Sequence, residues 1–482
     1  MKPPFDIAAD LDTPVSAFAK LRAAASGATG SPGLRPLFLL ESVEGGERLG
    51  RYSFIGFGLA GMVRLDERGL VLTDGRGGER TLAGPEVRGA ELLAGLRAAM
   101  ATAPRLAPTV AGLPFDGGFV GAIGYDFVRR VERLPTVAAA GAGGPGAGGA
   151  DVLLAAPASM LVFDHSTRRM ALLHAGEEWE RQSLRREIIA ALRAAMPAQP
   201  IRRGHAPPTP SLSAGEFAER FATVQEHIRA GDVFQLVLSI RFSGGCHTEP
   251  FEVYRALRLL NPSPYMYFLD IGGTQLVGSS PEALVKLHEG VASLRPIAGT
   301  RKRGATEEED KRLEAELLAD PKEAAEHVML VDLARNDLGR VAEAGTVGVQ
   351  PYRSIERYSH VMHIVSGVQG RLRPGTDAFD LFAATFPAGT VVGAPKVKAM
   401  EIIERCEPVR RGFYAGTVGY FSRSGNMDQA IAIRTIMFRD GRYAYQAGAG
   451  IVEASTVQGE HQEILAKVGA LGAAMDLAEQ GL

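Results

Sequence analysis

Four short apolar segments follow one another between residues 265 and 295, separated by only a few polar, proline or glycine residues. Connections this short join antiparallel neighbours, because parallel strands need crossovers of about a dozen or more residues. Longer segments with helical spacing lie on both sides of this run. The sequence therefore predicts an α+β fold in which long helices pack outside a mainly antiparallel sheet. The expected strands are Tyr265–Ile271, Thr274–Gly278, Ala283–His288 and Val291–Arg295.

A chain of 482 residues exceeds what one hydrophobic core normally supports, so several cores or one composite core are expected. Its net charge of -2 excludes a bulk attraction to nucleic acid or to an anionic membrane. The only cysteines, Cys246 and Cys406, fit a reducing compartment and exclude a disulfide framework. No run of about 18 apolar residues occurs, and the first residues lack the parts of a signal peptide. We expect a soluble cytoplasmic protein.

Composition divides the chain into three regions. The segment 197–212 is rich in proline and is predicted to be a linker between an N-terminal region, 1–196, and a catalytic region, 213–476, with longer elements. Within the first region, Ala138–Gly149 is of low complexity and is expected to form an exposed loop.

Acidic residues interrupt an otherwise apolar helix predicted within Asp320–Val341. Helical spacing puts Glu326 on the same face as Leu330 and Leu333, with Glu323 one turn earlier. Burying an isolated carboxylate is costly, so Glu326 is a candidate metal ligand or catalytic acid. The alternative is that this face opens to solvent at the helix start, where acids also suit the helix dipole.

The predicted last helix has the same property. Glu460, Glu463 and Lys467 share one face beside an apolar stripe. Two helices that each carry Glu-x-x-Glu can hold a hard divalent cation, and the scarcity of histidine favours Mg²⁺ over zinc or a di-iron centre. A solvated face of glutamate and lysine is the alternative.

Three glycine-containing loops could bind an anion through exposed backbone amides. Each one alone is weak evidence, because tight turns need glycine in any case. The loops are PIAGTRKRG at Pro296–Gly304, FPAGTVVGAPK at Phe386–Lys396, and the segment Gly448–Gly450.

Single polar residues add further candidates. Arg434 lies in DQAIAIRTIMF, where alternate residues should face a core, and a buried guanidinium needs an anionic partner. A structural salt bridge is the alternative. Glu282 and His363 could act as a general acid and base if they line a cleft, although lone histidines are more often structural.

Taken together, these motifs resemble the chorismate-utilising enzymes. The resemblance rests on PIAGTRKRG, DPKEAAEHVMLVDLARNDLGRV, RYSHVMHIVSGVQG, FPAGTVVGAPKVKAMEII, GNMDQAIAIRT and QAGAGIV, in this order within residues 215–475. It implies two large, mainly antiparallel β-sheets packed as a sandwich with helices outside. It also implies Mg²⁺ as cofactor, held by Glu326, Glu463 and the ring carboxylate of chorismate.

The resemblance implies roles for the matching residues. Glu282 and His363 correspond to the acid/base pair, and Thr300 is grouped with them. Lys467 supports the acidic residues and the substrate. The implied substrate contacts are Gly299, Thr300, Tyr414, Arg434, Gly448, Ala449, Gly450 and Lys467.

Two positions distinguish the reactions of this family. Ala298 stands where the aminodeoxychorismate synthases have a lysine nucleophile, and Gln235 stands where the water-using relatives have a lysine base. Ammonia is therefore the expected nucleophile, adding at C2 of chorismate before pyruvate is eliminated to give anthranilate. The alternatives are release of the aminated intermediate, as by an aminodeoxyisochorismate synthase, the aminodeoxychorismate reaction, or a catalytically silent tryptophan-binding subunit.

The expected reaction needs a source of ammonia, and its rate is expected to be regulated. Neither cysteine has the setting of a glutaminase nucleophile, so a separate glutaminase subunit and a hetero-oligomer are expected. The stretch LLESVEGGERLGRYSFIG resembles the family's tryptophan-feedback element. It implies an inhibitor site formed by Leu40, Glu41, Ser42, Pro264, Tyr265 and Met266.

Overall fold

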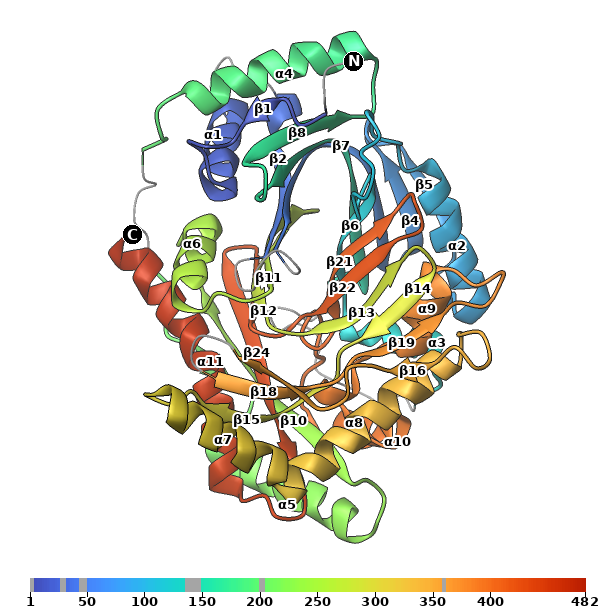
Figure 1. Cartoon of the computed structure of the whole chain (residues 1–482), viewed down its shortest axis with the longest axis vertical. Helices are drawn as coiled ribbons and strands as arrows, with labels where there is room; N and C mark the ends of the chain where they lie inside the picture. Colours follow the sequence, from blue (N-terminus) through green and yellow to red (C-terminus); the bar gives the residue numbers. More distant parts are fainter. Residues whose placement is uncertain (1–3, 27–31, 43–49, 135–148, 199–203, 358–360) are drawn as a thin grey trace.

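The computed structural model describes residues 4–26, 32–42, 50–134, 149–198, 204–357 and 361–482. The segment 138–148 of the predicted low-complexity loop and part of the predicted linker, 199–203, lie outside the described residues. Helices surround a large sheet (Figure 1). The α-helices are α1 Pro14–Ser26, α2 Gly89–Thr102, α3 Val128–Val131, α4 Glu178–Arg193, α5 Ala214–Arg229, α6 Pro250–Leu260, α7 Glu307–Ala319, α8 Pro321–Gly339, α9 Ala378–Thr385, α10 Lys396–Cys406 and α11 Val457–Gln480, and the short 3₁₀ helices are η1 Pro32–Leu34, η2 Tyr125–Phe127 and η3 Gly389–Val391.

The longest strands of the first half, β3 Tyr52–Asp66 and β7 Val152–Asp164, are strongly apolar and mostly buried, as expected for strands covered on both faces. The other strands of the first half are β1 Ile7–Ala8, β2 Pro36–Glu41, β4 Gly69–Asp74, β5 Glu79–Ala83, β6 Gly118–Ile123, β8 Arg169–His174 and β9 Thr209–Pro210. Those of the second half are β10 Gln235–Gly245, β11 Tyr265–Ile271, β12 Thr274–Ser280, β13 Ala283–His288, β14 Val291–Leu294, β15 Ile297–Lys302, β16 Gly348–Val349, β17 Ser354–Arg357, β18 Val361–Val365, β19 Val368–Arg371, β20 Gly393–Ala394, β21 Thr417–Ser422, β22 Met427–Ile431, β23 Thr435–Arg439 and β24 Arg442–Ile451.

All strand pairs among the described residues are antiparallel, which confirms the predicted sheet type and the α+β class. The two predicted layers are joined at their edges into one curled sheet of 21 strands, and β15, β18 and β17 form a separate small sheet. The N-terminal and C-terminal halves share the large sheet, because β2 pairs with β11 and β6 pairs with β21. The division of the chain at 197–212 stays a prediction.

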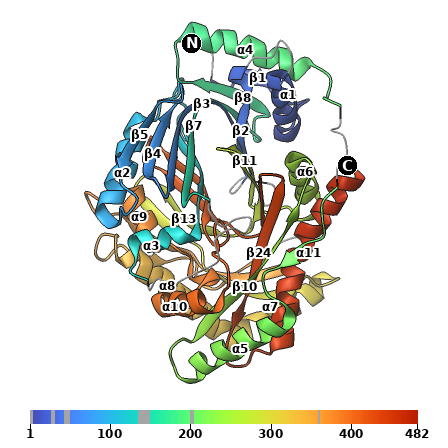
Figure 2. The ribbon, with the colours of Figure 1, turned by 180° about the vertical axis from the view of Figure 1, so that it is seen from behind.

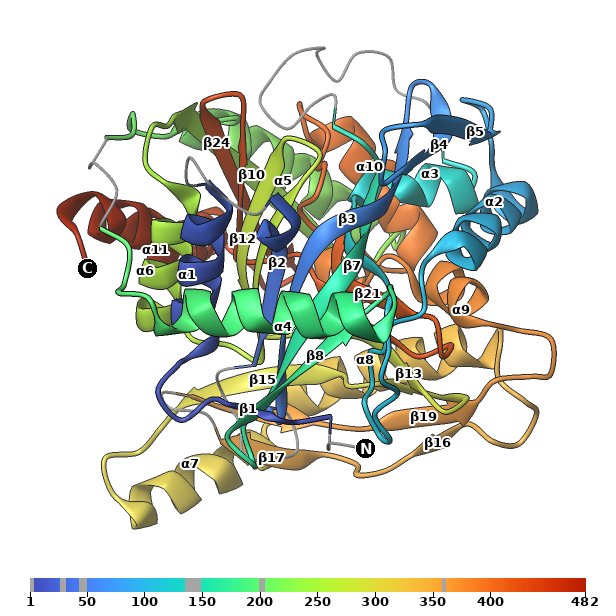
Figure 3. The ribbon, with the colours of Figure 1, turned by 90° about the horizontal axis from the view of Figure 1, so that it is seen from above.

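Alternation along the strands gives the curled sheet two apolar faces. On β11, Met266 and Phe268 belong to the core beneath the helices, whereas Tyr267 and Leu269 belong to a second core between the facing layers. Figure 2 shows β10 and β24 side by side on the reverse side, with α5 and α11 beside them. Figure 3 shows β15 and β17 near α7, at one side of the molecule.

Two long strands expected from the sequence are interrupted. The segment 428–438 is divided into β22 and β23, and the segment 360–372 into β18 and β19, which belong to different sheets. The first interruption places Arg434 between two strands, with φ of 50°. Alternation alone could not predict this break, because the apolar pattern continues through it.

Candidate active site

A cavity of about 420 Å³ opens where β10 and β24 meet β15, α8 and α11. A second cavity of about 640 Å³ adjoins it and shares Glu282, Ala298, Thr300, Arg434 and Lys467. We call the two together the cleft. The first cavity also holds Gln235, Gly299, Glu326, Tyr414, Gly448, Gly450, Glu460 and Glu463, and the second holds His363.

Acidic side chains from two helices meet in the cleft. Burial raises the pKa of Glu326 on α8, and the charges of Glu323 and Glu463 raise it further. Burial also raises the pKa of Glu460 on α11, and the charge of Glu463 adds to that rise. These carboxylates therefore repel one another, and the nearby charges of Lys322 and Lys467 offset that repulsion only in part.

The described residues contain no group of three histidine, cysteine, aspartate or glutamate side chains close enough to hold a metal ion. Glu326 and Glu463 nevertheless fit a hard cation that completes its coordination with substrate oxygens and water. Glu323 is less suitable as a direct ligand, because Arg301 donates to its carboxylate over 3.2 Å.

Lys467 connects the acidic helix to a glycine segment. Its ammonium lies 2.7 Å from the carboxylate of Glu463, one turn earlier on α11, and donates to the carbonyl of Gly448 over 2.9 Å. This places one positive charge between the acids and β24.

Glu282 follows β12 and lines both cavities. Burial raises its pKa to about 7, against the opposing effects of a Thr390 hydrogen bond and of the charges on Lys467 and Arg434. The Thr390 hydroxyl donates to its carboxylate over 2.9 Å. At neutral pH a large share of Glu282 is protonated and can act as a general acid.

His363 on β18 faces the larger cavity. Its Nδ1 lies 3.1 Å from the Gly299 carbonyl and 3.0 Å from the Thr300 hydroxyl. Because a carbonyl can only accept, the proton of the neutral ring lies on Nδ1 and leaves Nε2 as the basic atom. Burial lowers the pKa of His363, which favours this neutral form.

Arg434 lines both cavities from the break between β22 and β23. Its backbone adopts the left-handed region, with φ of 50°, which is costly for a long side chain. Its carbonyl accepts a hydrogen bond of 3.1 Å from the Ser279 amide. The predicted strand position for Arg434 was therefore wrong, because the residue lies in the break between β22 and β23.

Glycines bring backbone close to the cleft at three positions. A Cβ built on Gly448 would lie 2.8 Å from Val237 and 2.9 Å from the Tyr414 hydroxyl, and one on Gly450 would lie 2.5 Å from Gln235. Gly299 has φ of 67°. Ala449, between two of these glycines, is buried and does not line the cleft.

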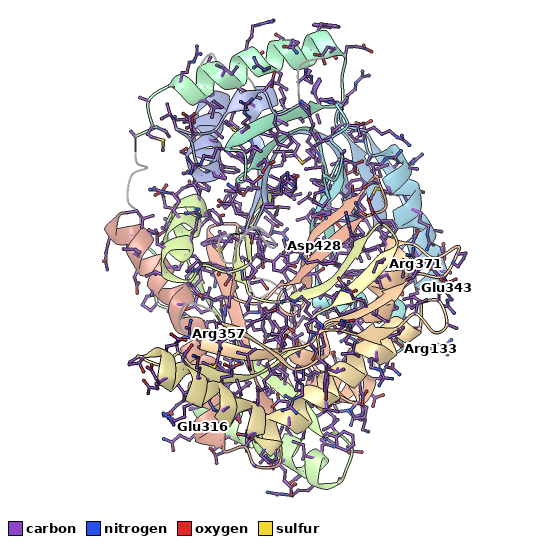
Figure 4. The ribbon with its side chains drawn as sticks, in the orientation of Figure 1. Arg133, Glu316, Glu343, Arg357, Arg371 and Asp428 are labelled. Carbon is purple, nitrogen blue, oxygen red and sulfur yellow. The ribbon has the colours of Figure 1, made fainter. Side chains whose placement is uncertain are left out.

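A further cavity of about 430 Å³ lies between the layers and is lined by all six residues of the predicted inhibitor site, Leu40, Glu41, Ser42, Pro264, Tyr265 and Met266. Among the described residues, the buried Ser42 hydroxyl has no hydrogen-bond partner. Asp428 lies toward the middle of the molecule in Figure 4 and also lines this cavity. It pairs with Lys286 over 2.9 Å and accepts from the Tyr265 hydroxyl over 3.1 Å.

The sequence analysis missed several residues of these sites. Thr390 was seen only as part of a glycine loop, although a hydroxyl before a buried turn is a usable signal. Lys322, on α8 within a quoted motif, and Ser455, just before α11, also line the cleft, and the sequence analysis gave neither of them a role. No helix among the described residues combines the length and apolar character needed to cross a membrane.

An acidic cleft beside an arginine and glycine-lined walls, within a curled antiparallel sheet, has the composition of an enzyme active site. Residues 36–472 match the family model described as chorismate binding enzyme, and the chain belongs to that family. Its full-length relatives include anthranilate synthase component 1 of Pseudomonas aeruginosa, 42% identical over 99% of this chain and 96% of that protein. The same protein of Thermus thermophilus is 43% identical over 98% of this chain and 97% of that protein.

Two solved structures have a similar fold. The crystal structure of anthranilate synthase component I from Streptococcus pneumoniae superposes with a TM-score of 0.74 at 34% identity, over 89% of this chain and 95% of that chain. The isochorismate synthase MenF of Escherichia coli, at 18% identity and a TM-score of 0.67, covers 97% of this chain and 92% of its own and shows the shared fold.

Proposed function

We propose that this enzyme is the large subunit of an anthranilate synthase, which aminates chorismate at C2 with ammonia and then eliminates pyruvate, within tryptophan biosynthesis. The observation that carries the proposal is the joining of the acidic pair Glu326 and Glu463 with Arg434 and Glu282 in one cleft. Full-length similarity to proteins of that name supports it.

Binding of the substrate follows from the charges. The guanidinium of Arg434 and the amides near Gly299, Gly448 and Gly450 suit its carboxylates, and Tyr414 offers a hydroxyl beside Gly448. Glu326 and Glu463 would hold Mg²⁺, whose two positive charges would offset part of the negative charge of the two acids and of the ring carboxylate. Lys467 holds Glu463 in place for this role.

Proton transfer is divided between two residues. Protonated Glu282 is suited to donate to the C4 hydroxyl as it leaves, because its pKa of about 7 keeps a proton available at neutral pH. Neutral His363, with Nε2 unprotonated, is suited to accept the C2 proton when pyruvate is eliminated. Thr300 orients His363 through its hydroxyl.

The choice of nucleophile follows from the neutral residues in the cleft. Ala298 cannot attack a ring carbon, and Gln235 is a poor base for water, so ammonia is the favoured nucleophile. Cys246 and Cys406 are both buried, and burial raises the pKa of the Cys406 thiol to about 11. Neither suits glutamine hydrolysis, so a separate glutaminase subunit would supply ammonia within a hetero-oligomer. The free thiols also suit the cytoplasm.

The cavity between the layers suits feedback inhibition by tryptophan. It combines aromatic and apolar walls with Glu41, Lys286 and Asp428, which suits a zwitterionic aromatic amino acid. The hydroxyl of Ser42, which has no partner within the described part of the chain, would supply a further polar contact. Inhibitor bound between the layers would favour one arrangement of the sheet over another.

A product assay tests the proposal. Purified protein is incubated with chorismate, ammonium and Mg²⁺, and products are separated and identified by mass. Anthranilate and pyruvate in equal amounts are expected. Accumulation of the aminated intermediate without pyruvate, or a 4-amino product, would assign a different reaction, and absence of any turnover would leave a binding subunit.

A further inference from the structure

Arg411 lies behind the cleft and does not line it. Its side chain is only 1% exposed and pairs with Glu407, whose carboxylate is 4% exposed. The pair is bidentate: Nε donates to one carboxylate oxygen over 2.9 Å, and Nη2 donates to the other over 2.7 Å. An ion pair this deeply buried is costly to form and needs further hydrogen bonds to compensate.

Those hydrogen bonds reach the backbone of two cleft walls. Nη1 donates to the Val391 carbonyl over 2.7 Å, and Nη2 donates to the Val237 carbonyl over 2.9 Å. Val391 and Val237 both line the cleft. The guanidinium also lies over the ring of Tyr414, a third cleft residue, 5.6 Å from its centroid.

The hydrogen bond from Arg411 to Val391 lies next to the residue that contacts the catalytic acid Glu282. Val391 follows Thr390, whose hydroxyl donates to the Glu282 carboxylate over 2.9 Å. On the other side, the Val392 carbonyl accepts from the Val237 amide over 2.8 Å. The end of the 3₁₀ turn η3 is therefore held at two successive carbonyls, directly after the Thr390 hydroxyl that contacts Glu282, and Arg411 binds the first of these carbonyls.

Glu407 extends the same arrangement to β24. One of its oxygens accepts from the amide and hydroxyl of Ser239 over 2.9 and 2.6 Å, and the same hydroxyl accepts from Gln446 over 2.8 Å. Ser239 stands opposite Gly448 in the strand pairing. The buried pair thus contacts β10, η3 and the Tyr414 segment at once.

We propose that Arg411 is a positioning residue for the reaction, which holds Thr390 against Glu282 and fixes Tyr414 beside Gly448. This inference rests on the proposed function for its kinetic consequences. Lysine at position 411 would keep the charge next to Glu407, but one ammonium cannot reproduce the planar fork toward two carbonyls and a carboxylate.

The test compares Arg411→Lys with Thr390→Val and with the double variant. Arg411→Lys is expected to lower kcat roughly 10- to 100-fold with less than about a threefold change in KM, as for a misplaced catalytic group. Loss of the Thr390 hydrogen bond raises the pKa of Glu282, so the basic limb of the pH profile moves to higher pH. The double variant should shift that limb no further than Thr390→Val alone.

Arg129→Lys is the matched control. Arg129 is 17% exposed and pairs with Asp126 and Glu404, none of which lines the cleft. Its kinetics and pH profile should match the wild type. Hydrogen exchange of the intact protein gives a readout independent of activity: Arg411→Lys should speed exchange within residues 388–394, and Arg129→Lys should not.

The outcomes separate the two proposals. Wild-type kcat and pH profile in Arg411→Lys, or faster exchange spread over the whole chain, would overturn the positioning role. A wild-type protein that does not convert chorismate would overturn the proposed function, and exchange within residues 388–394 would then still decide whether Arg411 holds η3.

Discussion

Thr390 donates a 2.9 Å hydrogen bond to the carboxylate of Glu282 across 108 residues of sequence. The bond favours the ionised carboxylate, while burial favours the neutral acid and dominates, which leaves the pKa of Glu282 at about 7. A carboxyl group inside a cleft whose pKa lies near 7 can donate a proton at physiological pH. The pH dependence of turnover is therefore the most direct measure of its role.

The first prediction concerns that pH dependence. If Glu282 acts as the protonated acid, kcat/KM falls as pH rises through about 7, because the proton is lost. Glu282→Gln should lose roughly 100-fold or more in kcat and should lose this basic limb, since an amide cannot donate a proton as an acid does. Anthranilate fluorescence, measured over a pH series, gives both quantities. A basic limb that persists in the variant would assign it to another group.

The same carboxyl group makes stability depend on pH. Its pKa in the folded protein lies above the ordinary value of 4.5, so the folded state binds more protons than the unfolded state between 4.5 and about 7. The free energy of unfolding therefore falls as pH rises through that window. Glu282→Gln should lack this fall, and melting temperatures measured from pH 5 to 8 check the sign.

A second prediction concerns the acidic pair. Glu326→Gln and Glu463→Gln should each lower Mg²⁺-dependent turnover roughly 100-fold or more, because each removes charge that the cation needs. Without Mg²⁺, Glu326→Gln should keep or raise the melting temperature, since burial and neighbouring acids already disfavour its charged form. Activity is measured across a Mg²⁺ series.

Asp332→Asn is the control for the acidic pair. It lies on α8 like Glu326, but it is 62% exposed and pairs with Arg335 at the surface. Its turnover and Mg²⁺ dependence should be unchanged. If both glutamine variants kept the Mg²⁺ dependence of the wild type, the metal assignment would be refuted.

The sequence predicted those site residues whose positions follow from the regular spacing of a helix or strand. Glu326 and Glu463 lie on regular helices, so periodicity grouped Glu326 with Leu330 and Leu333 and put Glu463 beside an apolar stripe. It left open whether these faces meet a site or solvent, and the structure has both residues in one cleft. Spacing did not predict the position of Arg434, because a local φ of 50° interrupts its strand without changing the apolar pattern.

Contacts across long stretches of sequence were not predictable. Arg411 meets the Val237 carbonyl from 174 residues away, and nothing in the local sequence indicates that partner. The fold class followed from the short connections around residues 265–295. The edge pairings that join both layers into one curled sheet, such as β2 with β11, depend on tertiary packing that alternation does not encode.

A third prediction concerns the inhibitor cavity. Ser42→Ala should weaken tryptophan inhibition roughly tenfold, by loss of one hydrogen bond, while leaving turnover without tryptophan nearly unchanged. Ser42→Phe, which fills part of the cavity, should weaken tryptophan inhibition further.

Binding can also be measured through stability. Tryptophan at about 100 times its Kd should stabilise the wild type by about 2.7 kcal/mol, and both variants should show a smaller rise in melting temperature at that concentration. Identical inhibition curves for all three proteins would remove this site from consideration.

A fourth prediction uses the glycines of the cleft wall. Gly448→Ala should destabilise the protein by about 1 to 3 kcal/mol, because its Cβ would lie 3.0 Å from the Leu238 carbonyl, which is backbone, as well as 2.8 Å from Val237. It should also raise KM for chorismate, since the methyl group enters the space beside the Tyr414 hydroxyl.

Gly450→Ala should lower the free energy of unfolding by less than Gly448→Ala, because its nearest neighbour is the movable end of Gln235 at 2.5 Å. Gly245→Ala on β10 is the control, with no heavy atom within 4 Å of its Cβ, and should change stability by less than about 0.5 kcal/mol. Denaturant unfolding and chorismate kinetics measure both effects, and equal values for all three variants would contradict the close approach at Gly448.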